Sequence, residues 1–150
     1  EMAEAVVAAA AEADALLMAA AVADFRPRAA VAQKLKRGAG VPELSLEPTE
    51  DILAMVVGRR RKTGRPQIVV GFAAESQDLV GNAQAKLQAK GLSMIVANDV
   101  SDPQAGFAVD TNRVTLIDAD GTLQELPLMT KAEVAEVVVL RVAAMLGKLP

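Results

Sequence analysis

Three runs of consecutive apolar residues, each followed at once by a polar residue, recur along the chain. They are "ALLMAAAVAD" at 15–24, "IVVGFAAES" at 68–76 and "MIVAND" at 94–99. A short apolar run without polar alternation is typical of a strand buried on both faces. Segments of good helix formers, at 1–13, 49–62 and 78–91, lie around these runs. The alternation predicts a doubly wound, mainly parallel α/β sheet.

The ends of the remaining elements follow from capping and turn residues. Thr49 is expected to cap the helix over 49–62, whose last turn holds the cations of "RRRK", and Gly91 is expected to end the helix over 78–91. The segment 112–128 predicts a hairpin that turns at Asp120 and Gly121, and Thr130 predicts the cap of a closing helix. The hairpin and the closing helix are expected to be mainly scaffold.

Composition limits the possible chemistry. The 150 residues suffice for one domain, 1–150, and their net charge of −3 gives no overall attraction to nucleic acid or to an anionic membrane. The chain has no cysteine and no histidine, which excludes disulfides, thiolate nucleophiles and imidazole catalysis. Acidic residues interrupt the apolar N-terminal segment, so neither a signal peptide nor a membrane span is expected, and a cytoplasmic protein is the default interpretation.

Polar side chains stand where the predicted strands end. Asp24, Glu75, Asn98 and Asp99 follow the three apolar runs, and the carboxyl ends of parallel strands share one edge of a sheet, where ligands bind. We therefore expect these side chains to converge on one site. The alternative is that each merely caps the following turn or helix.

The segment after Asp24 is basic in a chain that is acidic overall. Arg26, Arg28, Lys34, Lys36 and Arg37 gather there, an arrangement that suits a polyphosphate, and Asp24 beside them suits the divalent cation of a nucleoside triphosphate. A solvated charged loop is the other interpretation. The sequence contains neither G-x-G-x-x-G nor G-x-x-x-x-G-K-[ST], and without tyrosine it cannot be a typical short-chain reductase.

Seven segments in register carry a family resemblance: "AAAVADFRP", "KLKR", "EDIL", "VGFAAES", "AKLQAKG", "IVANDVS" and "GFAVDTNRVTLI", with "LPLMTKAEVAEVV" closing the chain. Together they resemble the synthetase domain of phosphopantothenoylcysteine synthetase, over nearly the whole chain. The resemblance implies a Rossmann-like fold and a CTP-dependent reaction of coenzyme A biosynthesis, in which an acyl-cytidylate of 4'-phosphopantothenate reacts with cysteine. It also implies a homodimer, with strand extensions for which the 112–128 hairpin is a candidate, and fusion to a flavin-dependent decarboxylase.

The resemblance assigns roles to particular residues. Lys34 matches the catalytic lysine that contacts the triphosphate, and Asp24 matches the acid that binds nucleotide and Mg²⁺. The further positions it implies for the nucleotide are Ala21, Ala23, Phe25, Lys36, Phe72, Ala73, Lys86, Lys90 and Asn98. Lys86 and Lys90 are four apart on one predicted helix, where exposed lysines commonly serve only solubility.

Two departures from the family pattern affect what can be carried over. The usual "NPDIL" is "TEDIL" here, so a role of its asparagine does not transfer, and the family's glycine-rich first βα unit has no counterpart. We therefore expect the chain to be the C-terminal portion of that domain, unable to complete the synthesis by itself. A different nucleotide-binding enzyme on the same sheet, such as a nucleotide-sugar or dinucleotide enzyme, and a non-catalytic assembly module remain as alternatives.

Overall fold

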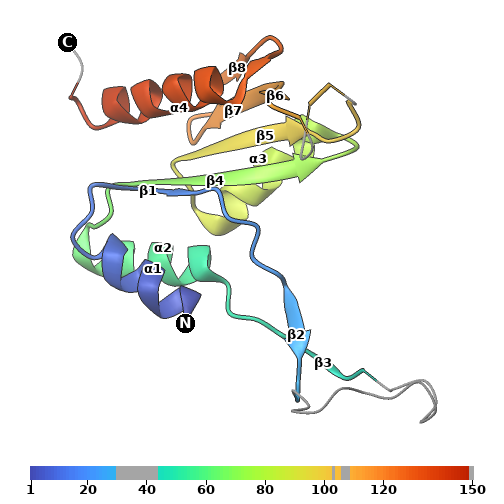
Figure 1. The fold of residues 1–150 in the computed structure, drawn as a ribbon. Helices are drawn as coiled ribbons and strands as arrows, with labels where there is room; N and C mark the ends of the chain where they lie inside the picture. The colour runs from blue at the N-terminus through green and yellow to red at the C-terminus, as the bar shows by residue number, and fades with distance from the viewer. Residues whose placement is uncertain (30–43, 103, 106–108, 149–150) are drawn as a thin grey trace, which may run out of the picture. The chain divides into compact units, whose positions relative to one another are not determined.

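A central sheet of five strands organises the chain in the computed structural model, which describes residues 1–29, 44–102, 104–105 and 109–148. The strands are β1 (Ala15–Met18), β4 (Ile68–Glu75), β5 (Met94–Asp99), β7 (Val114–Asp118) and β8 (Leu123–Glu125), in the order β1-β4-β5-β7-β8. β1, β4 and β5 are parallel, and β7 and β8 are antiparallel (Figure 1). The predicted mainly parallel α/β sheet and its C-terminal hairpin are confirmed.

Helices cover both faces of this sheet (Figure 1). α1 (Met2–Ala10), α2 (Ile52–Thr63) and α3 (Leu79–Lys90) lie on one face, and α4 (Lys131–Met145) lies on the other. Two short strand pairs complete the structure: β2 (Phe25–Pro27) with β3 (Leu46–Pro48), and β6 (Thr111–Asn112) with β9 (Met129–Thr130). None of the helices in the described ranges is both long and apolar enough to cross a bilayer.

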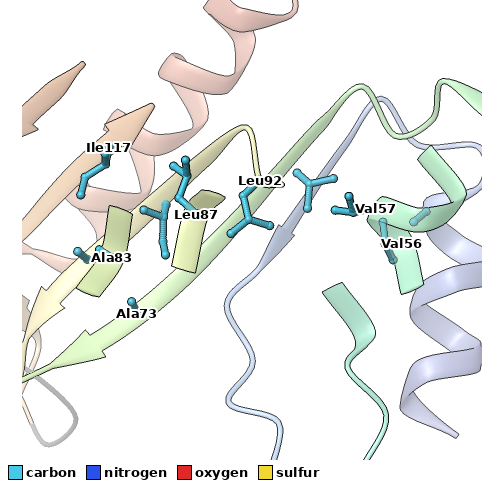
Figure 2. Packing of buried hydrophobic residues seen from close by; sticks show 11 residues of the cluster. Val56, Val57, Ala73, Ala83, Leu87, Leu92 and Ile117 are labelled. Carbon is cyan, nitrogen blue, oxygen red and sulfur yellow. The ribbon is translucent and has the colours of Figure 1, made fainter. Parts of the chain in front are cut away.

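The core consists of two apolar layers, because side chains of successive strand residues point to opposite faces. Val69, Ala73 and Ile95 pack with α2 and α3 on one face. Figure 2 shows Ala73 of this layer together with Ala83 and Leu87 of α3. Val70, Met94 and Val96 pack with α4 on the other. A Cβ at Gly71 would lie 2.6 Å from Cδ1 of Leu92, so a larger residue at this position would require the Leu92 side chain to shift.

The chain divides into two compact units, 20–51 and the rest. Within the smaller unit β2 and β3 form a short antiparallel ribbon, and the large unit contains the five-stranded sheet with its four helices. The first apolar run was expected to remain a strand up to Asp24. This prediction is wrong, because β1 ends at Met18 opposite Gly71 and the alanines after it are exposed.

Helix ends agree with the sequence at α3 and α4 and disagree at α2. Gly91 ends α3 at φ 63°, a left-handed conformation that glycine adopts without strain. Thr130 caps α4, as predicted. Thr49, however, lies three residues before Ile52, the first residue of α2, and its hydroxyl donates to the carbonyl oxygen of Ala23.

The cap of α4 gives a pH prediction. The Thr130 hydroxyl and amide donate to the Glu133 carboxylate at 2.7 and 2.8 Å, and these hydrogen bonds lower the pKa of Glu133. The ionised Glu133 therefore stabilises the fold at any pH above the pKa that it has in the unfolded chain, about 4.3. This stabilisation is lost as the pH falls from there through the lower pKa of the folded state. Glu133→Gln should therefore reduce the melting temperature at pH 7 and should differ little from the wild type at pH 3, measured by circular dichroism. A difference independent of pH would contradict the assignment.

Candidate functional site

The carboxyl edge of the parallel strands brings part of the predicted site together. β4 and β5 are in register at this edge, with Ala74 beside Asn98 and Glu75 beside Asp99. Glu75, Asn98 and Asp99 therefore lie at one edge, as the pattern of strand ends predicted, but strand alternation places the Asn98 side chain on the face opposite that of Glu75 and Asp99. They lie where loops rather than strands continue the chain, which is the place at which α/β sheets bind ligands.

Phe72 and Asn98 offer an aromatic ring and a hydrogen-bond acceptor on one side of this edge. Strand alternation places both on the α4 side of the sheet, where Val70, Met94 and Val96 are also found. Phe72 is 36% exposed, whereas the Asn98 side-chain oxygen is buried and has no partner within the described part of the chain. A buried acceptor without a donor costs free energy, so this oxygen is suited to receive an N–H or O–H group from a ligand.

The other predicted residues of this unit face away from that side. Ala73 is buried in the core with α2 and α3, so its side chain cannot meet a ligand that contacts Phe72. Lys86 and Lys90 are half-buried on α3, which covers the same opposite face. Because α3 runs back from the carboxyl edge, Lys90 stands next to Gly91 at the amino edge, where Arg60 donates to the Gly91 carbonyl oxygen at 2.6 Å.

Asp99 is held by the turn that follows it. The Ser101 hydroxyl and backbone amide donate to Asp99 Oδ1 at 2.6 and 2.9 Å. These bonds, the side-chain one first, lower the pKa of Asp99, so the group is ionised at neutral pH. Asp99 therefore serves the local turn, as the capping alternative predicted for acids after strands, while Asn98 next to it has no such role.

Asp24 lies in the 20–51 unit, between two peptide groups that are bound by one residue. The Thr49 hydroxyl donates to the carbonyl oxygen of Ala23 at 2.5 Å, and the Thr49 amide donates to that of Asp24 at 2.9 Å. Ala21, Ala23, Asp24 and Phe25 are all exposed, and Phe25 is 61% exposed. The sequence did not reveal that Thr49 binds the peptide groups around Asp24, because these partners are 25 and 26 residues away and no local pattern marks them.

The basic segment is described only at its ends. Arg26 forms an ion pair with Glu47, with Nε 2.7 Å from Oε1, and both Arg26 and Arg28 are exposed. Lys34, Lys36 and Arg37 lie outside the described residues.

Mg²⁺ was the other group expected beside Asp24. The described residues contain no group of three or more carboxylate, histidine or cysteine side chains able to hold a resident metal ion. The single exposed carboxylate of Asp24 fits instead a Mg²⁺ that is shared with substrate phosphates, since this ion is commonly bound by one or two carboxylates and keeps several waters.

Comparisons with known proteins agree with the fold. Residues 1–146 match the family model described as DNA/pantothenate metabolism flavoprotein C-terminal domain. The "Coenzyme A biosynthesis bifunctional protein CoaBC" of Bacillus subtilis (strain 168) is 43% identical over 145 residues, which cover 97% of this chain and 35% of that protein. A "Cysteine/Cysteine sulfinic acid decarboxylase" from an unknown prokaryote is 47% identical over 135 residues, which cover 90% of this chain and 37% of that protein.

A solved structure shares the fold. The C-terminal domain of a Coenzyme A biosynthesis bifunctional protein CoaBC superposes with a TM-score of 0.74 at 34% sequence identity, covering 99% of this chain and 62% of that one. The chain thus spans little more than a third of the curated relatives quoted above and under two thirds of this solved domain. Together the family match and these relatives show that the chain belongs to the DNA/pantothenate metabolism flavoprotein C-terminal domain family.

Proposed function

We propose that this chain provides the nucleotide-binding part of a CTP-dependent ligase that joins 4'-phosphopantothenate to L-cysteine in coenzyme A biosynthesis. The observation that carries the proposal is the family match over residues 1–146, together with a relative named for coenzyme A biosynthesis that is 43% identical over 97% of the chain. The cytoplasm is the proposed location.

The reaction proceeds in two substitutions. A carboxylate oxygen of 4'-phosphopantothenate attacks the α-phosphorus of CTP, the bond to the β-phosphate oxygen breaks, and pyrophosphate leaves with that electron pair. The cysteine amine then attacks the acyl carbon of the acyl-cytidylate, loses a proton, and expels CMP. Such chemistry needs charge neutralisation and close placement more than an imidazole or a thiol, which suits a chain with neither.

The residues divide these tasks. Lys34 neutralises the triphosphate, and Asp24 holds the accompanying Mg²⁺, which offsets the phosphate charge when bound. Phe72 and Asn98 offer the nucleotide an aromatic surface and an acceptor. Lys36 and the backbone of Ala21, Ala23, Phe25 and Ala73 complete the proposed set, whereas Lys86 and Lys90 are left out of it because α3 covers the opposite face of the sheet.

A homodimer is part of the proposal. The β2–β3 ribbon supports it, because Phe25 and Pro27 share one face with Leu46 and Pro48 and that face is exposed, with Phe25 at 61% and Leu46 at 50%. A two-stranded ribbon with an apolar face has little stability alone. Sedimentation velocity tests this point, and a purely monomeric protein at micromolar concentration would exclude it.

The proposed function is tested by calorimetric titration of the intact protein with CTP and with ATP in the presence of Mg²⁺. Saturable CTP binding is expected, with an affinity at least about tenfold lower in Lys34→Gln, since one charged contact to phosphate is lost. Lys62→Gln, which changes an exposed lysine at the end of α2, serves as the matched control. CMP release that requires both 4'-phosphopantothenate and cysteine would complete the assignment, whereas an absence of CTP binding would remove it.

A further inference from the structure

Thr49 is the one residue in the described part of the 20–51 unit that binds both peptide groups flanking Asp24. Its hydroxyl donates to the oxygen of the peptide group before Asp24, at 2.5 Å, and its amide donates to the oxygen of the one after it, at 2.9 Å. All residues from 19 to 29 are exposed, so packing does not hold Asp24 in place. Hydrogen bonds supply the order that packing does not.

Two fixed peptide groups determine the direction of the side chain between them. Peptide groups are planar, so a residue has two soft backbone dihedrals, and these are set by the orientation of its two flanking planes. Thr49 binds the oxygen of each plane at Asp24. Thr49, a residue 25 positions further along the chain, therefore restrains the Cα–Cβ direction of Asp24.

We propose that Thr49 is a positioning residue that holds the Asp24 carboxylate ready for the divalent cation of a bound nucleoside triphosphate. This inference rests on the proposed function, because it gives Asp24 the task described there. A carboxylate in an exposed segment has to be ordered when the cation binds, which weakens binding. With Thr49 in place, the backbone part of that ordering is made before the cation arrives.

A purely architectural role is the competing explanation, in which Thr49 only closes the base of the β2–β3 ribbon. The two roles differ in their dependence on the cation. If Thr49 positions Asp24, its loss raises the Mg²⁺ concentration needed for half-maximal rate, and excess Mg²⁺ restores the rate. If Thr49 only closes the ribbon, the loss is the same at every Mg²⁺ concentration and follows the melting temperature.

The test compares Thr49→Val, which removes the hydroxyl donor at nearly constant shape, with Thr49→Ser, which keeps it. Thr63→Val is the matched control, since the Thr63 hydroxyl also donates to a backbone oxygen, that of Arg59, in the other unit. Steady-state rates of the intact protein are measured against CTP, Mg²⁺ and cysteine, with CTP titrations and melting temperatures alongside. Thr49→Val should raise the KM for CTP and the half-activating Mg²⁺ concentration about fivefold, the usual effect of one lost hydrogen bond.

Each result decides the inference. The inference is supported if Thr49→Ser keeps the wild-type Mg²⁺ requirement and excess Mg²⁺ restores the rate of Thr49→Val. The KM for cysteine should be unchanged, and Thr63→Val should have the wild-type rate and Mg²⁺ requirement. If the wild type binds CTP and ligates while Thr49→Val has the same Mg²⁺ requirement, or loses rate uniformly as its melting temperature falls, Thr49 does not position Asp24 and the proposed function stands. If the wild type does not bind CTP, both are overturned.

Discussion

Asp24→Asn is expected to slow CTP-dependent ligation at least about 100-fold, with no change in melting temperature. The amide keeps the shape of the carboxylate and loses the negative charge that a Mg²⁺ ligand provides, an electrostatic contribution of several kcal/mol. Asp24 is exposed, and no described residue forms an ion pair with it, so its charge contributes little to folding. Rates of CMP release and thermal melts measure the two effects separately.

A matched exposed acid provides the control for Asp24. Asp110→Asn alters an exposed aspartate of the other unit and should leave both the rate and the melting temperature unchanged. Because the proposed role of Asp24 is to bind the cation, the half-activating Mg²⁺ concentration should rise in Asp24→Asn and stay constant in Asp110→Asn. Equal rates in the two variants would mean that Asp24 is not a ligand of the catalytic cation.

Arg141→Met is expected to lower the free energy of unfolding by about 2–3 kcal/mol. Arg141 on α4 donates through Nε at 3.1 Å, and also through Nη2, to Oδ2 of Asp118 at the end of β7. The Asp118 side chain is 11% exposed, and its other oxygen is buried with no partner in the described ranges. Removing the guanidinium leaves the buried Asp118 charge unpaired. Because Arg141 is partly exposed, we expect a loss of stability smaller than that for a fully buried ion pair. Urea denaturation measures the loss.

A double substitution separates the cost of the unpaired charge from that of lost packing. Asp118→Leu combined with Arg141→Met should recover most of the stability, because two apolar side chains replace a buried ion pair at little cost. Arg113→Met is the control, since the Arg113 side chain is 54% exposed and its Nη1 lies 3.5 Å from Oδ2 of Asp102. This substitution should lower the free energy of unfolding by less than about 1 kcal/mol. A loss in Arg141→Met as small as that of this control would show that the pair between β7 and α4 contributes little.

The sheet could be predicted because its signals are local. β4 and β5 are continuous apolar runs bounded by polar residues, Gly91 adopts the left-handed conformation that its position requires, and Thr130 with Glu133 forms a complete capping box. In each case the deciding residues lie within a few positions of one another. Tertiary contacts then agree with local preference.

The predictions that were wrong depended on distant contacts. The alanine-rich run after Met18 counts as apolar, yet alanine buries little surface, and the strand ends where its pairing with β4 ends. Thr49 is a residue type that commonly caps helices, but its hydroxyl and amide donate to backbone oxygens more than twenty residues upstream. Residue types alone cannot predict where β1 ends or what Thr49 binds, because both depend on contacts between segments that are distant in the sequence.

The candidate site was predictable as a place and only partly as a set of contacts. Strand ends predicted that Asp24, Glu75, Asn98 and Asp99 converge, and the register of β4 with β5 brings Glu75, Asn98 and Asp99 to one edge, with the Asn98 side chain on the face opposite that of Glu75 and Asp99. Which of them is already satisfied could not be read from the sequence: Asp99 is bound by Ser101, while the Asn98 oxygen lacks a donor in the described chain. Such a difference arises from the turn geometry after β5.

The division of the chain into two units also has a consequence for amide hydrogen exchange. Val69 and Ile95 lie in buried central strands, so their amides should exchange only through global unfolding. The exposed β2–β3 ribbon makes few stabilising contacts, and its amides should exchange through local opening at far faster rates. Protection acquired by the amides of Asp24 and Thr49 on addition of a nucleotide would therefore report ordering of the ribbon, and any change in the protection of Val69 and Ile95 would separately report stabilisation of the sheet.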